Sequence, residues 1–292
     1  MTDFDGTARI HDRGYRGFAG ARLGPGSSTA TLYRHTLYRV LGIQRGARAK
    51  ILPILTLAFA YLPAIAFIGI AAFLPKKIAR STLPGYADYY GFVTAAIVVF
   101  VAFVAPEALC PDRRSRMLGL YLASPLTRAR YVIAKIAAVA TVVLGVTLGP
   151  PLLLAVAYSL EGFGPSFSDL VLLLLRVGAA GLALGAFYTT FSLGASSLTD
   201  RRGFASTGII LSIILSGAAT GIFYRLGAPQ EIRLLNLSYV PFETVQRIYG
   251  APSVGQQPDT VATWAVFAAF AVWTVAGTTA VWWRYHRIEV SR

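Results

Sequence analysis

Long apolar runs separated by short polar segments dominate this chain. A helix that crosses the apolar core of a bilayer needs about 20 predominantly apolar residues. Six runs reach that length, and two of them carry a charge: Lys135 near one end of the third and Arg176 within the fourth. The predicted spans cover residues 51–74, 89–109, 131–158, 170–198, 203–224 and 262–283. The pattern therefore predicts an all-α, polytopic membrane protein with six transmembrane helices.

The predicted spans form one domain with a polar segment on each side. The basic N-terminal extension, the transmembrane domain and the short tail comprise residues 1–50, 51–283 and 284–292. In the extension, residues 32–45 have the periodicity of an amphipathic helix, with Arg34, Arg39 and Arg45 opposite the apolar side chains. Such a helix is expected in the membrane interface, facing anionic headgroups. It either leads into the first span or also contacts a partner subunit.

Composition excludes two other classes of protein. The chain is 55% hydrophobic and 14% charged, and its mean hydropathy is +0.58. This is more apolar surface than one soluble core of 292 residues would bury, and it also argues against intrinsic disorder. The net charge of +14 is compatible with nucleic-acid binding. However, the basic residues lie between the apolar runs and form no patch with exposed aromatics, so we expect no nucleic-acid partner.

The basic residues instead indicate the topology. Nineteen of the 27 Lys and Arg lie in the two terminal segments and the loops that share their side, against six on the other side. By the positive-inside rule, both termini are expected in the cytoplasm. No apolar core with a small-residue cleavage site precedes the first span, so that span is expected to direct insertion itself.

Few residues could support chemistry. Cys110 is the single cysteine, no GxxxxGK[ST] phosphate loop occurs, and the three histidines lie outside the spans. The segment 194–197 resembles a serine nucleophile motif but lacks a membrane-embedded histidine as its base. No acidic residue lies near mid-membrane, which disfavours a proton-coupled transporter. We therefore expect no catalytic residue, no metal and no cofactor bound by this chain.

The loop between the second and third spans has a distinctive pattern. Glu107 ends the second span, Asp112-Arg-Arg-Ser follows, and a short Leu-rich segment leads to Ser-Pro-Leu-Thr-Arg, Tyr131 and Lys135. Asp112 and Thr127 are candidate helix caps, and Pro125 disfavours helical geometry at the residue before it. A short helix over residues 113–123 is predicted, with charged and apolar positions mixed. On this evidence alone, a docking helix and an ordinary solvated loop are equal alternatives.

This pattern resembles the coupling segment of ATP-binding-cassette (ABC) transporter permeases of the type-2 export class. The N-terminal stretch 14–24, followed by a basic amphipathic helix, is similar to many bacterial members. The resemblance implies six spans with both termini inside, in a bacterial cytoplasmic membrane. It also implies work as a dimer, with a second permease copy or paralogue, on two ATPase subunits that bind ATP and Mg²⁺.

By this resemblance, residues 113–123 would form the coupling helix and residues 32–45 the interfacial elbow. The turn at 199–203 would make a smaller contact. The residues expected to couple to the ATPase are Asp112, Arg113, Arg114, Arg116, Leu118, Leu120, Leu122 and Pro125, with Asp200 and Arg201 in the second turn.

Three further features have two interpretations each. Arg176 either faces a transport pathway, paired with Asp169, or extends to the surface. Gly217 and Gly221 permit close helix approach, either in the permease dimer or within one protomer. A short helix from Pro241 to before Gly250 is expected on or in the outer leaflet, where the family has re-entrant helices.

The leading hypothesis is thus the permease subunit of an ATP-driven exporter that works by alternating access in contact with membrane lipids. The alternative is a membrane assembly or anchor protein that recruits a cytoplasmic partner through its basic loops without transporting anything. An intramembrane enzyme is disfavoured by the missing histidine and acidic residues.

Overall fold

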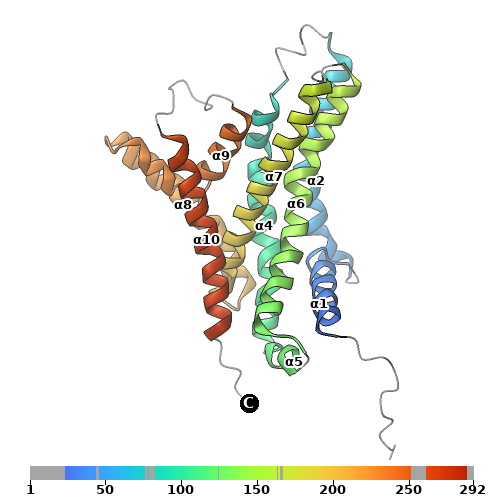
Figure 1. The fold of residues 1–292 in the computed structure, drawn as a ribbon, viewed down its shortest axis with the longest axis vertical. Coiled ribbons are helices and arrows are strands. Elements are labelled where there is room, and N and C mark those ends of the chain that lie inside the picture. Colours follow the sequence, from blue (N-terminus) through green and yellow to red (C-terminus); the bar gives the residue numbers. More distant parts are fainter. Residues whose placement is uncertain are drawn as a thin grey trace, which may run out of the picture.

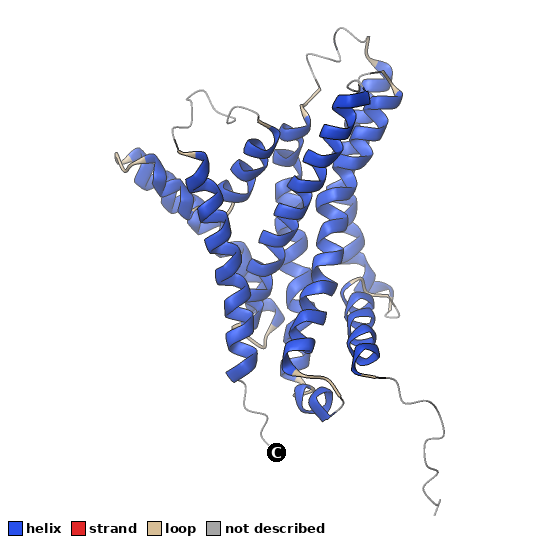
Figure 2. Ribbon diagram, in the orientation of Figure 1, coloured by secondary structure: helices blue, strands red, loops and turns tan. Residues whose placement is uncertain are grey.

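The computed structural model describes most of the chain. The described residues are 24–43, 46–75, 78, 83–123, 125–162, 164, 167–250 and 261–287. Every regular element within these ranges is helical (Figure 2). The long helices are α2 (Ala47–Phe73), α4 (Tyr86–Arg114), α6 (Arg128–Leu160), α7 (Phe167–Ser197), α8 (Arg202–Arg225) and α10 (Thr263–Arg287).

The six predicted spans are confirmed as helices. Each long helix contains a segment that is long and apolar enough to cross a membrane. Most extend a few residues beyond the apolar runs at one or both ends, and they range from 24 to 33 residues. Polar residues continue these helices where they contact other parts of the protein, so apolar runs underestimate the helices at their ends.

The N-terminal helix differs from its prediction. Helix α1 (Pro25–Val40) begins seven residues before the expected 32–45 segment and ends before its last five positions. Pro25 occupies the first turn, where a missing N–H costs nothing. Gly42 has a φ of 68°, and the amides of Gly42 and Ile43 donate to the carbonyls of Arg39 and Tyr38. This is a Schellman motif, which ends the helix. Arg45 and the 14–23 stretch lie outside the described residues.

The predicted loop helix is divided. Residues 113 and 114 belong to α4, and the short helix α5 (Leu118–Ala123) comprises only six residues. Between them, Arg116 has a φ of 53°, which breaks the helix at this point. Asp112 therefore lies within α4 and is not a cap. The Thr127 cap is confirmed, because its hydroxyl accepts a hydrogen bond of 3.3 Å from the amide of Arg130.

Helix α4 is the centre of the bundle. It packs against α2, α6, α7, α8 and the short helix α9 (Tyr239–Tyr249), and 61% of its apolar segment is buried. The corresponding fractions are 17% for α2 and α8 and 11% for α10, so these three helices form the periphery. In Figure 1, α8 leans away from α2 and α6 toward the end of the bundle at which α9 lies.

Helix α9 confirms the short helix expected before Gly250, but it lies inside the protein more than expected. It packs against α7, α10 and α4, and a 3₁₀ turn, η1 (Gln230–Leu235), precedes it. The apolar side chain of Val245 is buried, and the polar side chains of Glu243 and Gln246 are buried as well. Gly250 ends α9 in the left-handed conformation, with a φ of 67°.

Small residues permit a close contact between the backbones of α7 and α10. A Cβ placed on Gly277 would lie 2.6 Å from the carbonyl oxygen of Thr190, and one on Gly194 would lie 3.1 Å from that of Gly277. The predicted pair on α8 differs. A Cβ on Gly217 would lie 3.7 Å from Asn236 of the same chain, and one on Gly221 would meet open space.

These distances predict that Gly277→Ala destabilises the protein. The obstructing atoms are backbone, so α7 and α10 must separate, at a cost of about 1–3 kcal/mol. Thermal unfolding of the purified protein in detergent measures the effect. Gly221→Ala is the matched control, because its added methyl group meets nothing. Equal stability of the two variants would contradict the close contact.

Candidate functional site

The residues expected to couple to an ATPase gather at one end of the bundle, which we call the basic end. It contains α1, α5, the turn at residues 198–201 and the end of α10 (Figure 1). At its centre lies the Asp112 carboxylate, whose side chain is 1% exposed. Its Oδ1 accepts a hydrogen bond from Arg39 of α1, and its Oδ2 lies 2.7 Å from Lys135 Nζ of α6. Tyr131 also donates to Oδ2, at 2.9 Å.

These four residues, Arg39, Asp112, Tyr131 and Lys135, form the Asp112 cluster. A buried ion pair costs desolvation energy, which is recovered only when geometry is good and the remaining polar atoms are bonded. Here one carboxylate accepts hydrogen bonds from Arg39 and Tyr131 and forms an ion pair with Lys135, so groups from two other helices meet it. Lys135 is also only 1% exposed and has the Tyr131 ring 5.4 Å away. The cluster therefore fixes α1 and α6 to the end of α4.

Aromatic rings extend the cluster toward α5 and α10. The Tyr131 ring lies 5.8 Å from Tyr121 of α5 and 5.4 Å from Tyr285 of α10. Both separations are within the range of favourable aromatic packing. Burial, and then the Asp112 charge, raise the pKa of Tyr121, so this side chain is neutral. Tyr121 thus provides a direct packing link between α5 and the cluster.

Arginines attach the other helices at this end. Arg113 donates to the carbonyls of Ser197, the last residue of α7, and of Thr199, the latter at 3.1 Å. Arg128 donates to the His286 carbonyl near the end of α10, at 2.6 Å. In both cases a cation meets the negative end of a helix dipole. Arg202 at the start of α8 pairs with Glu107 of α4.

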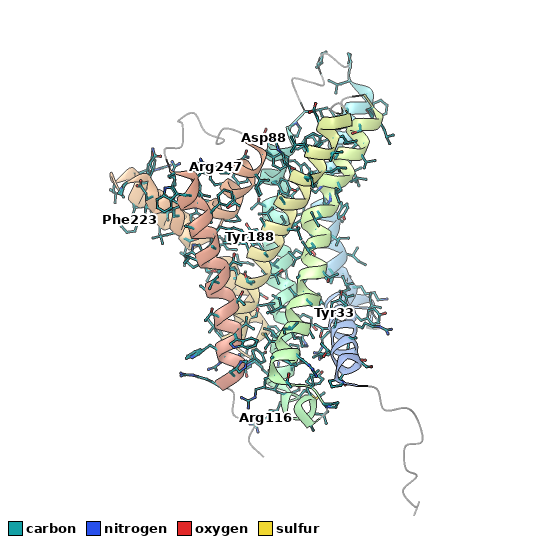
Figure 3. All side chains as sticks on the ribbon, viewed as in Figure 1. Tyr33, Asp88, Arg116, Tyr188, Phe223 and Arg247 are labelled. Carbon is teal, nitrogen blue, oxygen red and sulfur yellow. The ribbon has the colours of Figure 1, made fainter. Side chains whose placement is uncertain are left out.

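The residues expected to couple to an ATPase therefore divide into two groups. Arg114, Arg116, Pro125, Asp200 and Arg201 are exposed, and Leu120 is 66% exposed. Asp112, Arg113 and Leu118 instead bond or pack within the chain, and Leu118 is 7% exposed. Leu122 lies in α5, outside the residues whose side chains are described. Figure 3 shows Arg116 at the tip of the basic end.

Sequence reasoning did not identify the partners of Asp112. Tyr131 and Lys135 formed part of the recognised loop pattern, and Arg39 belonged to the expected elbow, but no contact was assigned to them. The available signal was charge at matching depth. A lysine inside an apolar run, an aspartate at the end of another and an arginine on an amphipathic helix each need a counter-charge.

Arg176 lies near the opposite end of the bundle, on α7. It is half-buried and interacts electrostatically with Tyr249 of α9. Asp169, its expected partner, is exposed. Arg34 of α1 is exposed as well, as the amphipathic pattern predicted.

With this geometry established, comparison with known families decides the membership of the chain. Residues 74–282 match the model of ABC-2 family transporter proteins, which is more than two thirds of the 292 residues. The chain belongs to the ABC-2 transporter family. None of the curated proteins compared with the chain matches it.

The ABC-2 match includes most of the candidate site. It begins directly after α2 and runs from α4 into α10, so that every residue of the Asp112 cluster except Arg39 lies within it. As a member of the ABC-2 family, the chain is a multi-pass membrane component of a transporter. This component is not itself catalytic. Within the described residues, no group of three or more His, Cys, Asp or Glu could hold a metal ion.

The Asp112 cluster predicts a large effect of a small change. Asp112→Asn should lower the free energy of unfolding by about 3–5 kcal/mol, because Lys135 would stay buried without a counter-charge. Thermal unfolding in detergent measures this. Asp200→Asn makes the same change at an exposed carboxylate and should shift stability by no more than about 0.5 kcal/mol.

A second substitution tests the cause. Asp112→Asn combined with Lys135→Met removes the buried cation too, and should recover part of the lost stability. A double variant as unstable as the sum of both single variants would contradict an unpaired charge as the source of the cost.

Proposed function

We propose that this chain is the permease subunit of an ATP-driven exporter in a bacterial cytoplasmic membrane. It would work with a second permease copy or paralogue and two ATPase subunits, which would bind ATP and Mg²⁺. The observation that carries the proposal is the arrangement of α5. This short, exposed helix joins two long spans and is attached directly to a buried ionic cluster.

The cluster suits α5 to transmit movement. Asp112 lies six residues before α5, and Tyr131 and Lys135 follow it at the start of α6. The Asp112 carboxylate bonds Tyr131 and so holds together the segments before and after α5. Leu118 and Tyr121 of α5 pack against the protein core. A force applied to α5 would therefore move α4 and α6 as one unit rather than deform the loop. Alternating access requires such coordinated helix movement.

The exposed surface of α5 is suited to a protein groove. Leu120 offers an apolar side chain, and Arg116 supplies a cation at the turn before the helix. An apolar anchor beside a positive charge is typical of a docking surface for a partner with a complementary pocket. Asp200 and Arg201 line a separate groove, which contains no residue of α5.

At the other end, α9 would close the pathway. Arg247 of α9 bonds Glu243 Oε1 at 2.9 Å, Thr263 Oγ1 at 2.8 Å and the Val261 carbonyl at 3.0 Å. Thr263 is the first residue of α10, and Val261 lies two residues before it. One guanidinium therefore attaches α9 to α10 (Figure 3 labels Arg247). Movement that breaks these bonds would release α9 from its buried position.

The α5 proposal is tested by Leu120→Asp. Affinity purification of the full chain from its native host in mild detergent should recover an ATPase with the wild type and lose most of it with this variant. Loss of the apolar contact of a leucine side chain costs about 1.5–3 kcal/mol, which is at least a tenfold loss of affinity. The negative charge of the aspartate in an apolar contact adds to this cost. Mass spectrometry and ATP hydrolysis by the eluate measure the outcome.

Leu160→Asp provides the matched control, because Leu160 is 83% exposed at the opposite end of α6. This variant should keep the ATPase. If the wild type recovers no ATPase, the permease proposal fails and the assembly-protein alternative is favoured. If Leu160→Asp also loses the ATPase, α5 is not the specific contact.

The α9 proposal is tested by Arg247→Met. Loss of three bonds to a charged group should make amide exchange of residues 239–249 about tenfold faster in hydrogen–deuterium exchange. Arg225→Met, an exposed arginine at the end of α8, is the control and should leave this exchange unchanged. Unchanged exchange in the Arg247 variant would contradict the role of this side chain in holding α9.

A further inference from the structure

A basic groove lies beside α5 at the same end of the bundle. It has a volume of about 1330 Å³ and runs between the end of α1, the end of α4 and the start of α8. Its charged lining consists of four arginines and one acidic residue: Arg39, Arg114, Arg201, Arg202 and Asp200. The groove therefore favours an anionic occupant.

Two of the four arginines in the groove are available to bind an anion. Arg39 is occupied by Asp112, and Arg202 by Glu107. Arg114 and Arg201 are exposed and have no ion pair with any residue that the structure describes. Arg201 also lies 5.6 Å from the Phe204 ring, which helps to orient it. Asp200 opposes these two cations with one negative charge.

The start of α8 adds amide donors to the groove. Arg201, at the N-cap, makes no side-chain hydrogen bond to the first amides of this 24-residue helix. A Cβ on Gly203 would meet nothing within 4 Å, so the backbone is accessible there. Helix N-termini bind phosphate through such amides and the helix dipole, and arginine pairs with phosphate in a bidentate way. The two features together suit a phosphate group.

An apolar stripe continues from the groove along α8. Phe204 lines the groove and is 65% exposed, and Leu211 and Leu215 follow it at 47% and 60% exposure. Their spacing of seven and four residues places all three on one face of the helix. Gly208, also on this face, leaves open space. The stripe lies in a membrane-spanning helix, so an acyl chain fits it better than a soluble anion or an acidic protein segment does.

We propose that this groove binds an anionic phospholipid. Arg114, Arg201 and the start of α8 would hold the phosphate, and Phe204, Leu211 and Leu215 would contact one acyl chain. The site does not depend on ATP-driven export, because each of its parts belongs to this chain.

Native mass spectrometry of the purified full chain in detergent, without any ATPase, tests the site. Titration with dioleoyl phosphatidylglycerol should show one bound lipid that phosphatidylcholine does not replace. Arg114→Ala with Arg201→Ala should weaken this binding about 30-fold, and Asp200→Asn should strengthen it about fivefold. Arg225→Ala, at the far end of α8, is the charge-matched control and should bind like the wild type. Equal unfolding temperatures establish that the variants are folded.

Two further comparisons distinguish the other occupants. Leu211→Ala with Leu215→Ala should weaken phosphatidylglycerol binding and leave binding of inorganic phosphate unchanged, because neither leucine lines the groove. If inorganic phosphate binds as tightly as the lipid, the groove is a free-anion site and the lipid proposal is wrong. If the double arginine variant keeps the lipid but loses a co-purifying ATPase, the groove is a protein contact, and the proposal is likewise overturned. Equal loss of lipid in Arg225→Ala would also overturn it.

Discussion

One buried carboxylate determines how the basic end is built. Asp112 is almost inaccessible, and a lone charge at such a position would be strongly unfavourable. Its bonding partners come from α1 and α6, which lie 73 residues before it and 19–23 residues after it in the sequence. If α1, α4 or α6 moved away alone, a buried charge would lose its partner. The three helices therefore move together or not at all. The position of α5 follows from this constraint, because α4 ends in the cluster and α6 begins in it.

The attachments of the other helices differ in strength. Gly277 and Gly194 bring the backbones of α7 and α10 into contact, which permits little independent movement of α10. Helix α8 is held at the basic end by Arg202 and Glu107, a pair in which the arginine is 51% exposed. An exposed pair contributes only about 0–1 kcal/mol. This ion pair therefore holds α8 only weakly at the basic end.

The sequence was a good guide to the helices and a poor one to the site. Apolar runs identify spans reliably because an unsatisfied backbone in lipid is costly, so each run must be helical. The end of α4 was misjudged because Cys110 to Arg114 are not an apolar run, and tertiary bonds made by Asp112 and Arg113 continue the helix there. The division of the loop helix at Arg116 depends on a single left-handed residue, which no periodicity indicates. Contacts between distant charges such as Arg39 and Asp112 require a knowledge of which helices are neighbours.

The excess of positive charge at this end has more than one origin. Counted along the chain, the arginines act as a topological signal, which treats them as equivalent. In the folded protein they are not. Arg39 and Arg202 neutralise carboxylates, and Arg113 and Arg128 bond carbonyls at the ends of α7 and α10. Arg114, Arg116 and Arg201 have exposed side chains without such partners among the described residues. The charge that this end can offer to a lipid or a protein is therefore much smaller than the sequence count, and it is concentrated in α8's first turn and the bend before α5.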